Sequence, residues 1–143
     1  MRIEHKLQID AIKGERIYYS EFGEWILLSD GKIGVYLKGN ELKIDKNKMH
    51  AMGNVEKLDP DYLMSGSIML NQTKTAHKTH LGYAIKLKNS EDNVHIFVLE
   101  KYLNMFYGYS GIAFKTLRNP ILITKYDQPY GIICPITINE EIE

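Results

Sequence analysis

The residues best suited to chemistry are the five histidines and the hydroxyl groups near them. His77-Lys78-Thr79 has the H-x-T spacing of half a two-histidine phosphoesterase site, where an imidazole transfers protons beside a hydroxyl group. Such a site requires a second half, and no other histidine of this chain has a hydroxyl residue two positions later. The sequence therefore predicts no catalytic residue, and we expect a protein that is not an enzyme.

Metal, thiol and phosphate-loop chemistry have equally little support. His77 and His80 would not share a face as ligands on a strand or loop, and no Cys or carboxylate lies near them. Cys134 lies in the apolar run IICPI, which is typical of a buried structural thiol. The glycines form neither a G-x-G-x-x-G nor a Walker pattern. We expect no metal site and no cofactor.

The charged residues are segregated although the net charge is zero, from 18 basic and 18 acidic side chains. No Asp or Glu occurs from Tyr62 to Ser90, and Lys32–Lys57 holds six lysines against three acidic residues. A locally basic region can bind a polyanion because salt confines the field to about 10 Å. The alternative is a solvated surface whose acidic neighbours fold back beside the lysines. In the acid-free segment, the candidate anion-binding residues are Lys74, His77, Lys78 and His80.

Alternating apolar residues and β-branched or aromatic side chains predict a chain made mainly of strands. Asp30-Gly31 predicts a hairpin, because both residues tolerate the positive φ of a type I′ turn. The predicted strands are Arg16–Ser20, Glu24–Ser29, Ile33–Leu37, Ser67–Thr75, Leu81–Lys88, Val94–Leu99, Gly111–Leu117, Ile121–Tyr126 and Tyr130–Ile138.

Two short helices are predicted among these strands. The first covers Lys46 to Met52, with Asp45 as its cap and Gly53 as its end. The second covers Glu100 to Tyr107 and ends at Gly108. The resulting order is strand–helix–three strands, twice, in residues 42–89 and 94–138, after an N-terminal hairpin region in 1–41. We expect one α+β domain over residues 1–143 with mainly antiparallel sheet.

The sequence also predicts a cytoplasmic protein. Its apolar runs are too short to span a bilayer, so no membrane partner is expected. The N-terminus MRIEHKLQID carries charges where a signal peptide needs an apolar stretch. The single Cys excludes an intramolecular disulfide and fits a reducing compartment.

Three motifs occur in the order found in one known family. The C-terminal part of the chain contains VLEKYL at 98–103, a strand at 111–117, NPILI at 119–123 and YGIICPI at 130–136. Upstream lie SDGKIG at 29–34 and DPDY at 59–62. The chain thereby resembles the bacterial β sliding clamp, the DNA polymerase processivity factor, whose chains close on a P-v-l-I … i-m-P-m-r-l pattern and carry T-D-G-H-R-L and F-P-D-Y segments.

The resemblance implies the DNA-clamp fold, in which each domain contains two strand–helix–strands units. It implies a pocket for hydrophobic partner peptides, such as those of a DNA polymerase, formed here by Ser29, Gly31, Lys32, Pro60, Cys134, Pro135 and Ile136. It also implies helices that present cations to duplex DNA without reading its sequence. The corresponding residues would be Lys43, Lys46, Lys48, His50, Lys57, Lys101 and Asn104.

Bacterial clamp chains have three domains, whereas this chain has about the length of one. Enclosing DNA would therefore require a cyclic homo-oligomer with head-to-tail interfaces, formed by edge strands that pair between subunits. The alternative is a small phage-type binding protein that sequesters a nucleotide, or a host replication or defence partner, without forming a ring.

Overall fold

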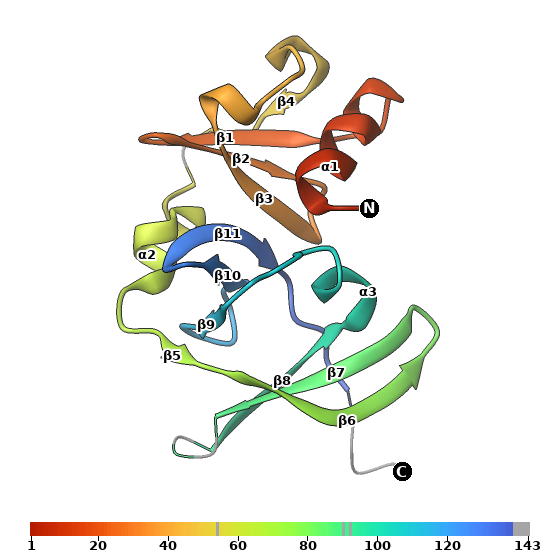
Figure 1. The fold of residues 1–143 in the computed structure, drawn as a ribbon, viewed down its shortest axis with the longest axis vertical. Helices are drawn as coiled ribbons and strands as arrows, with labels where there is room; N and C mark the ends of the chain where they lie inside the picture. The colour runs from red at the N-terminus through yellow and green to blue at the C-terminus, as the bar shows by residue number, and fades with distance from the viewer. Residues whose placement is uncertain (54, 90, 92, 139–143) are drawn as a thin grey trace.

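The computed structural model describes residues 1–53, 55–89, 91 and 93–138, and Figure 1 shows their arrangement. The α-helices are Ile3–Ile12 (α1), Pro60–Met64 (α2) and Glu100–Leu103 (α3). The strands are Tyr18–Phe22 (β1), Trp25–Ser29 (β2), Ile33–Lys38 (β3), His50–Ala51 (β4), Ile68–Met69 (β5), Asn71–Thr79 (β6), Gly82–Asn89 (β7), Val94–Leu99 (β8), Gly111–Phe114 (β9), Ile121–Lys125 (β10) and Gln128–Ile133 (β11). Among these helices, none is both long enough and apolar enough to cross a membrane.

The strands form two sheets. The larger has eight strands in the order β4-β1-β2-β3-β11-β10-β9-β5, and the smaller has the order β6-β7-β8. β1 and β4 run parallel, and every other neighbouring pair of described strands is antiparallel. The predicted α+β class with mainly antiparallel sheet is therefore confirmed.

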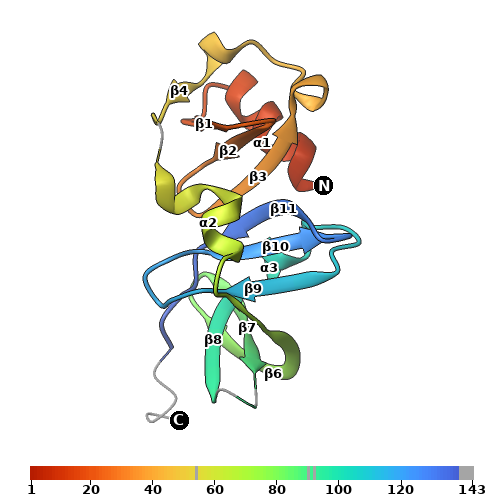
Figure 2. The same ribbon diagram turned by 90° about the vertical axis from the view of Figure 1, so that its left-hand side faces the viewer.

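The eight-stranded sheet is covered on both faces because its side chains alternate between two apolar cores. On β3, Val35 and Leu37 contribute to the larger core, while Tyr36 between them contributes to the smaller one. The larger core also contains residues of α1, α3 and the three-stranded sheet. The smaller core is covered by α2, which lies on the opposite side of the sheet from α3 (Figure 2).

A helix followed by three antiparallel strands occurs twice in the chain. α1 precedes β1, β2 and β3, and α3 precedes β9, β10 and β11. The last strands of the two sets, β3 and β11, pair antiparallel at Ile33–Val35 with Gly131–Ile133. We call this pairing of β3 with β11 the seam. Outward from the seam the strand order is β3, β2, β1 in one set and β11, β10, β9 in the other.

The predicted helix from Lys46 to Met52 is wrong. Asp45 caps this segment, and its carboxylate accepts a hydrogen bond from the Asn47 backbone N–H at 3.1 Å. Only a short 3-10 turn follows over Lys46–Lys48, and the chain then pairs with the edge of β1 as β4. The segment buries Met49 alone, so it lacks the apolar stripe that would hold a helix against the core. The helix of residues 42–89 is instead α2, in the order β4–α2–β5–β6–β7, and these strands are divided between the two sheets.

α1 occupies the N-terminal region that the sequence pattern placed in a hairpin. Ile3, Leu7 and Ala11 are four residues apart and lie buried on one side of this helix. The helix ends at Ile12, and Gly14, two residues later, has a φ of +89°, the left-handed conformation that glycine adopts without strain. The apolar Ile12 on the exposed side weakens the contrast between the faces, which hides the helix in the sequence.

Two smaller expectations are also corrected. The helix predicted for Glu100–Tyr107 extends only to Leu103, and turns continue to Gly108, whose φ is +73°. The hairpin at Asp30-Gly31 exists, but only Gly31 has a positive φ, so the turn is not type I′. Instead, the Asp30 carboxylate accepts hydrogen bonds from the backbone N–H groups of Lys32 (2.8 Å) and Ile33 (3.0 Å).

Candidate functional site

α1 and α3 lie side by side on one face of the large sheet and form a shared cleft. The Ile3 backbone N–H, at the start of α1, donates to the Met105 carbonyl just after α3 at 3.1 Å. The cleft has a volume of about 370 Å³. Its polar lining residues are Lys6, Asp10, Lys13, Lys101 and Asn104.

Cations outnumber carboxylates along this α1–α3 cleft. Lys6 pairs with Asp10 at 2.6 Å, and Lys13 and Lys101 are exposed without a salt bridge in the described part of the chain. The Arg2 guanidinium lies 5.3 Å from the ring centroid of Tyr107, at one end of the cleft. Glu4 of α1 is not among the lining residues of the cleft, and its carboxylate accepts a hydrogen bond from the Tyr130 hydroxyl of β11. A group of exposed cations such as Arg2, Lys13 and Lys101 is suited to contact phosphates.

The structure divides the seven predicted DNA-binding residues between two places. Lys101 and Asn104 line the α1–α3 cleft. The other five lie between β3 and α2, and these are Lys43, Lys46, Lys48, His50 and Lys57. None of these five residues lines the α1–α3 cleft, and the helix predicted to hold Lys46, Lys48 and His50 does not form.

Lys46 has a partner that neutralises its charge. Its ammonium group donates to the Glu21 carboxylate, and this hydrogen bond raises the pKa of Lys46 above its ordinary value. His50 lies beside Tyr18, with 5.9 Å between the ring centroids. These contacts are those of a solvated sheet edge.

Arg2, Lys6 and Lys13 were not expected at the cleft, because the N-terminal helix was not predicted. The signal was present in the apolar residues Ile3, Leu7 and Ala11, which repeat every four positions.

Four of the predicted peptide-pocket residues do come together. The hairpin residues Ser29, Gly31 and Lys32 lie beside Cys134, because β3 and β11 pair at this end. The Cys134 N–H donates to the Lys32 carbonyl at 2.9 Å, and its sulfur lies 3.7 Å from the Gly31 carbonyl oxygen. Cys134 is exposed rather than buried as expected, because β11 ends one residue earlier.

Pro135 and Ile136 line a different surface, a groove of about 360 Å³ beside β8. The Ile136 N–H donates to the Phe97 carbonyl at 2.8 Å, which fixes the last segment against the edge of β8. Leu117, 77% exposed, lines this groove and also an adjoining one of about 400 Å³ that includes Phe114. We call these two grooves together the Leu117 groove.

Pro60, the last predicted pocket residue, lies elsewhere. It is buried at the first turn of α2, which packs on β9 and β10. The Leu117 groove has no wall from Pro60 or from the Ser29–Lys32 hairpin. The seven residues therefore do not surround one cavity.

The candidate anion-binding residues lie on β6 and its turn, but not on one face. His77 pairs in register with Ala84 and Lys78 with Tyr83, so their side chains point to opposite sides. The rings of His77 and Phe97 are nearly perpendicular, with 5.1 Å between their centroids. Lys74 and His80 are exposed. Within the described residues, no three His, Cys, Asp or Glu side chains are close enough to hold a metal ion.

A scan against protein-family models finds no match to this chain, and searches of curated proteins and of solved structures likewise find none.

Proposed function

We propose that the protein is a non-enzymatic, clamp-like DNA-binding module that contacts the backbone of duplex DNA through the α1–α3 cleft. The observation that carries the proposal is the pair of helices on one face of the sheet. Arg2, Lys13 and Lys101 are exposed on or next to these helices, and Lys6 is half-buried beside Asp10. Two helix–three-strand sets joined at β3 and β11 support the resemblance to a sliding-clamp domain. Such contacts bind without reading bases.

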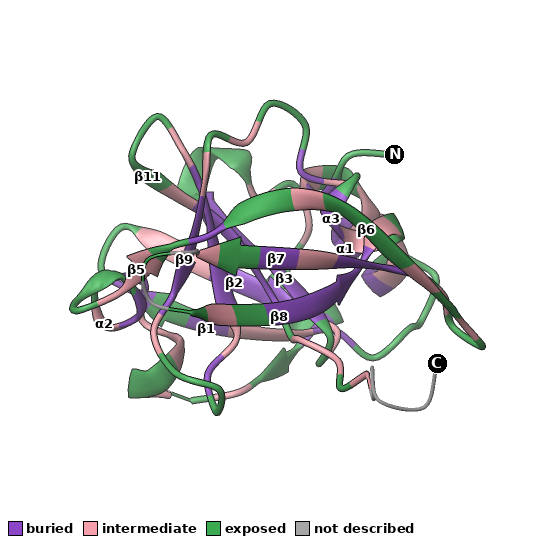
Figure 3. Cartoon of the chain, turned by 90° about the horizontal axis from the view of Figure 1, so that it is seen from below, coloured by how far each residue is buried: buried purple, intermediate pink, exposed green. Residues whose placement is uncertain are grey.

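Enclosing DNA requires several copies of this 16.5 kDa chain. β6 is a nine-residue edge strand of the small sheet and is exposed along most of its length (Figure 3). An unpaired edge of this length offers backbone groups to a second copy. We therefore propose a cyclic homo-oligomer in which β6 contributes to the subunit interface.

The Leu117 groove supports capture of a short hydrophobic peptide from a DNA polymerase or another partner. Its walls come from Phe97, Phe114, Leu117 and Ile136, and apolar grooves with a few polar groups suit such segments. This groove also favours the second candidate function, a monomeric protein that sequesters a replication or defence partner.

Charge reversal at the cleft tests DNA binding. Lys13→Glu with Lys101→Glu should lower affinity for a short duplex at least tenfold and reduce the slope of log K against log salt by about 2, because two phosphate contacts are lost. Fluorescence anisotropy with two unrelated sequences measures affinity, salt slope and sequence dependence. Lys46→Glu with Lys48→Glu is the matched control and should leave the affinity within about twofold.

Two results would contradict the proposal. Equal losses in both double variants would mean that the cleft is not the contact surface, and no salt-dependent binding by the wild type would remove DNA as a ligand. Light scattering during size-exclusion chromatography gives the mass separately. A mass of 16.5 kDa at micromolar concentration would exclude the ring and favour the sequestering protein.

A further inference from the structure

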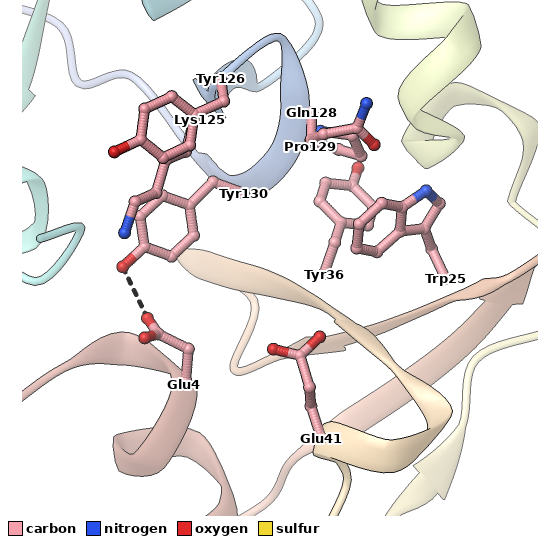
Figure 4. Close-up of a pocket in the computed structure, with 9 residues that line it drawn as sticks. All are labelled: Glu4, Trp25, Tyr36, Glu41, Lys125, Tyr126, Gln128, Pro129 and Tyr130. Carbon is pink, nitrogen blue, oxygen red and sulfur yellow. Dashed lines mark hydrogen bonds between the residues drawn. The ribbon is translucent and has the colours of Figure 1, made fainter. Parts of the chain in front are cut away.

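A second cavity opens where β3 and β11 separate. The two strands pair only at Ile33–Val35 with Gly131–Ile133, and beyond this seam they diverge. The space between them is a pocket of about 200 Å³, closed from the side by the first turn of α1 (Figure 4). It shares no lining residue with the α1–α3 cleft, although its Lys125 donates a hydrogen bond to the carbonyl of Tyr107, which lines that cleft.

Aromatic rings form the walls of this seam pocket. Trp25 and Tyr36 stand together on one side, beside Pro129, and Tyr130 stands on the other (Figure 4). Tyr36 is held in place because its hydroxyl donates to the Leu58 carbonyl at 2.5 Å. Tyr130 packs edge-to-face on Phe106, with 5.1 Å between the centroids. The rings are therefore fixed before any ligand arrives.

Two carboxylates complete the pocket, Glu4 from α1 and Glu41 from the turn after β3. Glu4 accepts a hydrogen bond from the Tyr130 hydroxyl at 2.7 Å, and Glu41 accepts one from the Lys38 backbone N–H at 2.8 Å. Each of these bonds uses a single carboxylate oxygen, Oε1. Neither carboxylate forms a salt bridge with any described residue.

The chain's own lysines already use the aromatic faces. The Lys38 ammonium lies 5.4 Å from the Trp25 centroid, and that of Lys125 lies 5.5 Å from the Tyr130 centroid. Cations bind to such faces because the ring quadrupole attracts them. Glu4 and Glu41 balance the charges of Lys38 and Lys125, so an incoming cation would compete with these two lysines for the rings and carboxylates.

We propose that the seam pocket binds the guanidinium group of an arginine side chain from a partner polypeptide. A guanidinium is planar, stacks on aromatic rings, and donates hydrogen bonds in a fork to carboxylate oxygens. The half-buried Trp25 supplies the ring face for stacking, beside the largely buried rings of Tyr36 and Tyr130, and the free oxygens of Glu4 and Glu41 supply the acceptors. This site is independent of DNA binding at the α1–α3 cleft.

Titration with N-acetyl-arginine methylamide tests the proposal, at constant ionic strength. Trp25 is the only tryptophan of the chain, so its fluorescence and its indole N–H signal in NMR report on the pocket directly. We expect saturation with a Kd of about 1 mM, typical of a single side chain. The citrulline analogue has nearly the same shape without the charge and should show no saturation.

Three variants sharpen the test. Glu41→Gln keeps an acceptor for the Lys38 N–H but loses the charge, and should weaken binding about tenfold. Lys125→Met removes the competing cation from Tyr130 and should strengthen binding about threefold. Glu15→Gln, at an exposed carboxylate outside the pocket, is the matched control and should change nothing.

The proposal is overturned by an arginine probe that gives no saturable signal, by equal binding of the citrulline probe, or by an unchanged affinity in Glu41→Gln. Loss of DNA binding at the cleft would leave all three of these measurements untouched, so the two sites are tested separately.

Discussion

At the scale of single residues, two tyrosines show how the core accommodates polar groups. Tyr36 is 3% exposed, and its hydroxyl has the Leu58 carbonyl as its partner. Burial and then the charge of Asp59 raise the pKa of Tyr36 well above its usual range. Tyr130 is similar, since burial and its hydrogen bond to Glu4 raise its pKa. Both hydroxyls therefore stay protonated in the folded protein.

We predict that Tyr36→Phe makes stability less sensitive to alkaline pH. A tyrosine with a raised pKa in the folded state contributes stability that is present below about pH 10, the unfolded value, and is lost as pH rises above it. The Tyr36→Phe variant should not show this loss of stability at high pH. At neutral pH the substitution should lower the free energy of unfolding by about 1 kcal/mol, because the Leu58 carbonyl loses its hydrogen-bond donor. Urea unfolding from about pH 8 to about pH 11 measures both effects.

Tyr126→Phe is the control for this measurement, because that ring is 80% exposed. If Tyr36→Phe and the wild type lose stability equally above about pH 10, the Tyr36 hydroxyl does not contribute to the pH dependence.

At the scale of elements, the seam between β3 and β11 depends on two glycines. Gly131 pairs with Val35, and Gly34 pairs with Ile132. A Cβ at Gly131 would collide with the Gly34 carbonyl oxygen and with the Phe106 ring. A Cβ at Gly34 would lie 2.9 Å from side-chain carbons of Leu27 and Ile132. Close approach of the two helix–three-strand sets therefore requires the absence of a side chain.

Gly131→Ala should destabilise the protein by about 2–3 kcal/mol, because the backbone of β3 cannot move away without opening the seam. Gly39→Ala is the matched control, since nothing lies within 4 Å of its Cβ position and its φ is not positive. The free energy of unfolding in urea measures both variants. A cost below about 0.5 kcal/mol for Gly131→Ala would show that the seam is looser than the packing implies.

At the scale of the whole molecule, the larger apolar core connects both helix–three-strand sets with the three-stranded sheet. The larger core contains Leu7 of α1, Val35 of β3, Ile85 of β7 and Ile133 of β11. The N-terminal elements thus share buried contacts with the three-stranded sheet although they are far apart in sequence. Dividing the chain at the seam would expose apolar surface on both sides.

We expect a single cooperative unfolding transition as a consequence. Trp25 fluorescence reports on the N-terminal strands, and far-UV circular dichroism reports on the whole chain. The two urea transitions should coincide in the wild type and in Leu7→Ala, which should lower stability by about 2–5 kcal/mol. An earlier Trp25 transition would mean that the N-terminal elements unfold as a separate unit.

Much of the fold could be predicted from local patterns. Alternation around Ile33–Leu37 and Ile121–Tyr126 identified strands that the structure contains as β3 and β10. Asp45 was correctly predicted as a cap, but a cap only starts a helix, and the helix over Lys46–Met52 lacks a buried face to continue it. The sequence pattern at Ile3–Ile12 was missed because apolar residues lie on both sides of α1.

The α+β class, the hairpins and the apolar residues that build the core follow from residue type and from spacing over a few positions. Which charged groups come together follows instead from the packing of the whole chain. Lys101 and Lys13 line the same α1–α3 cleft, whereas Lys46 pairs with Glu21 near the far edge of the sheet. Such pairings depend on which strands are neighbours, and that order is set by packing between residues distant in the chain.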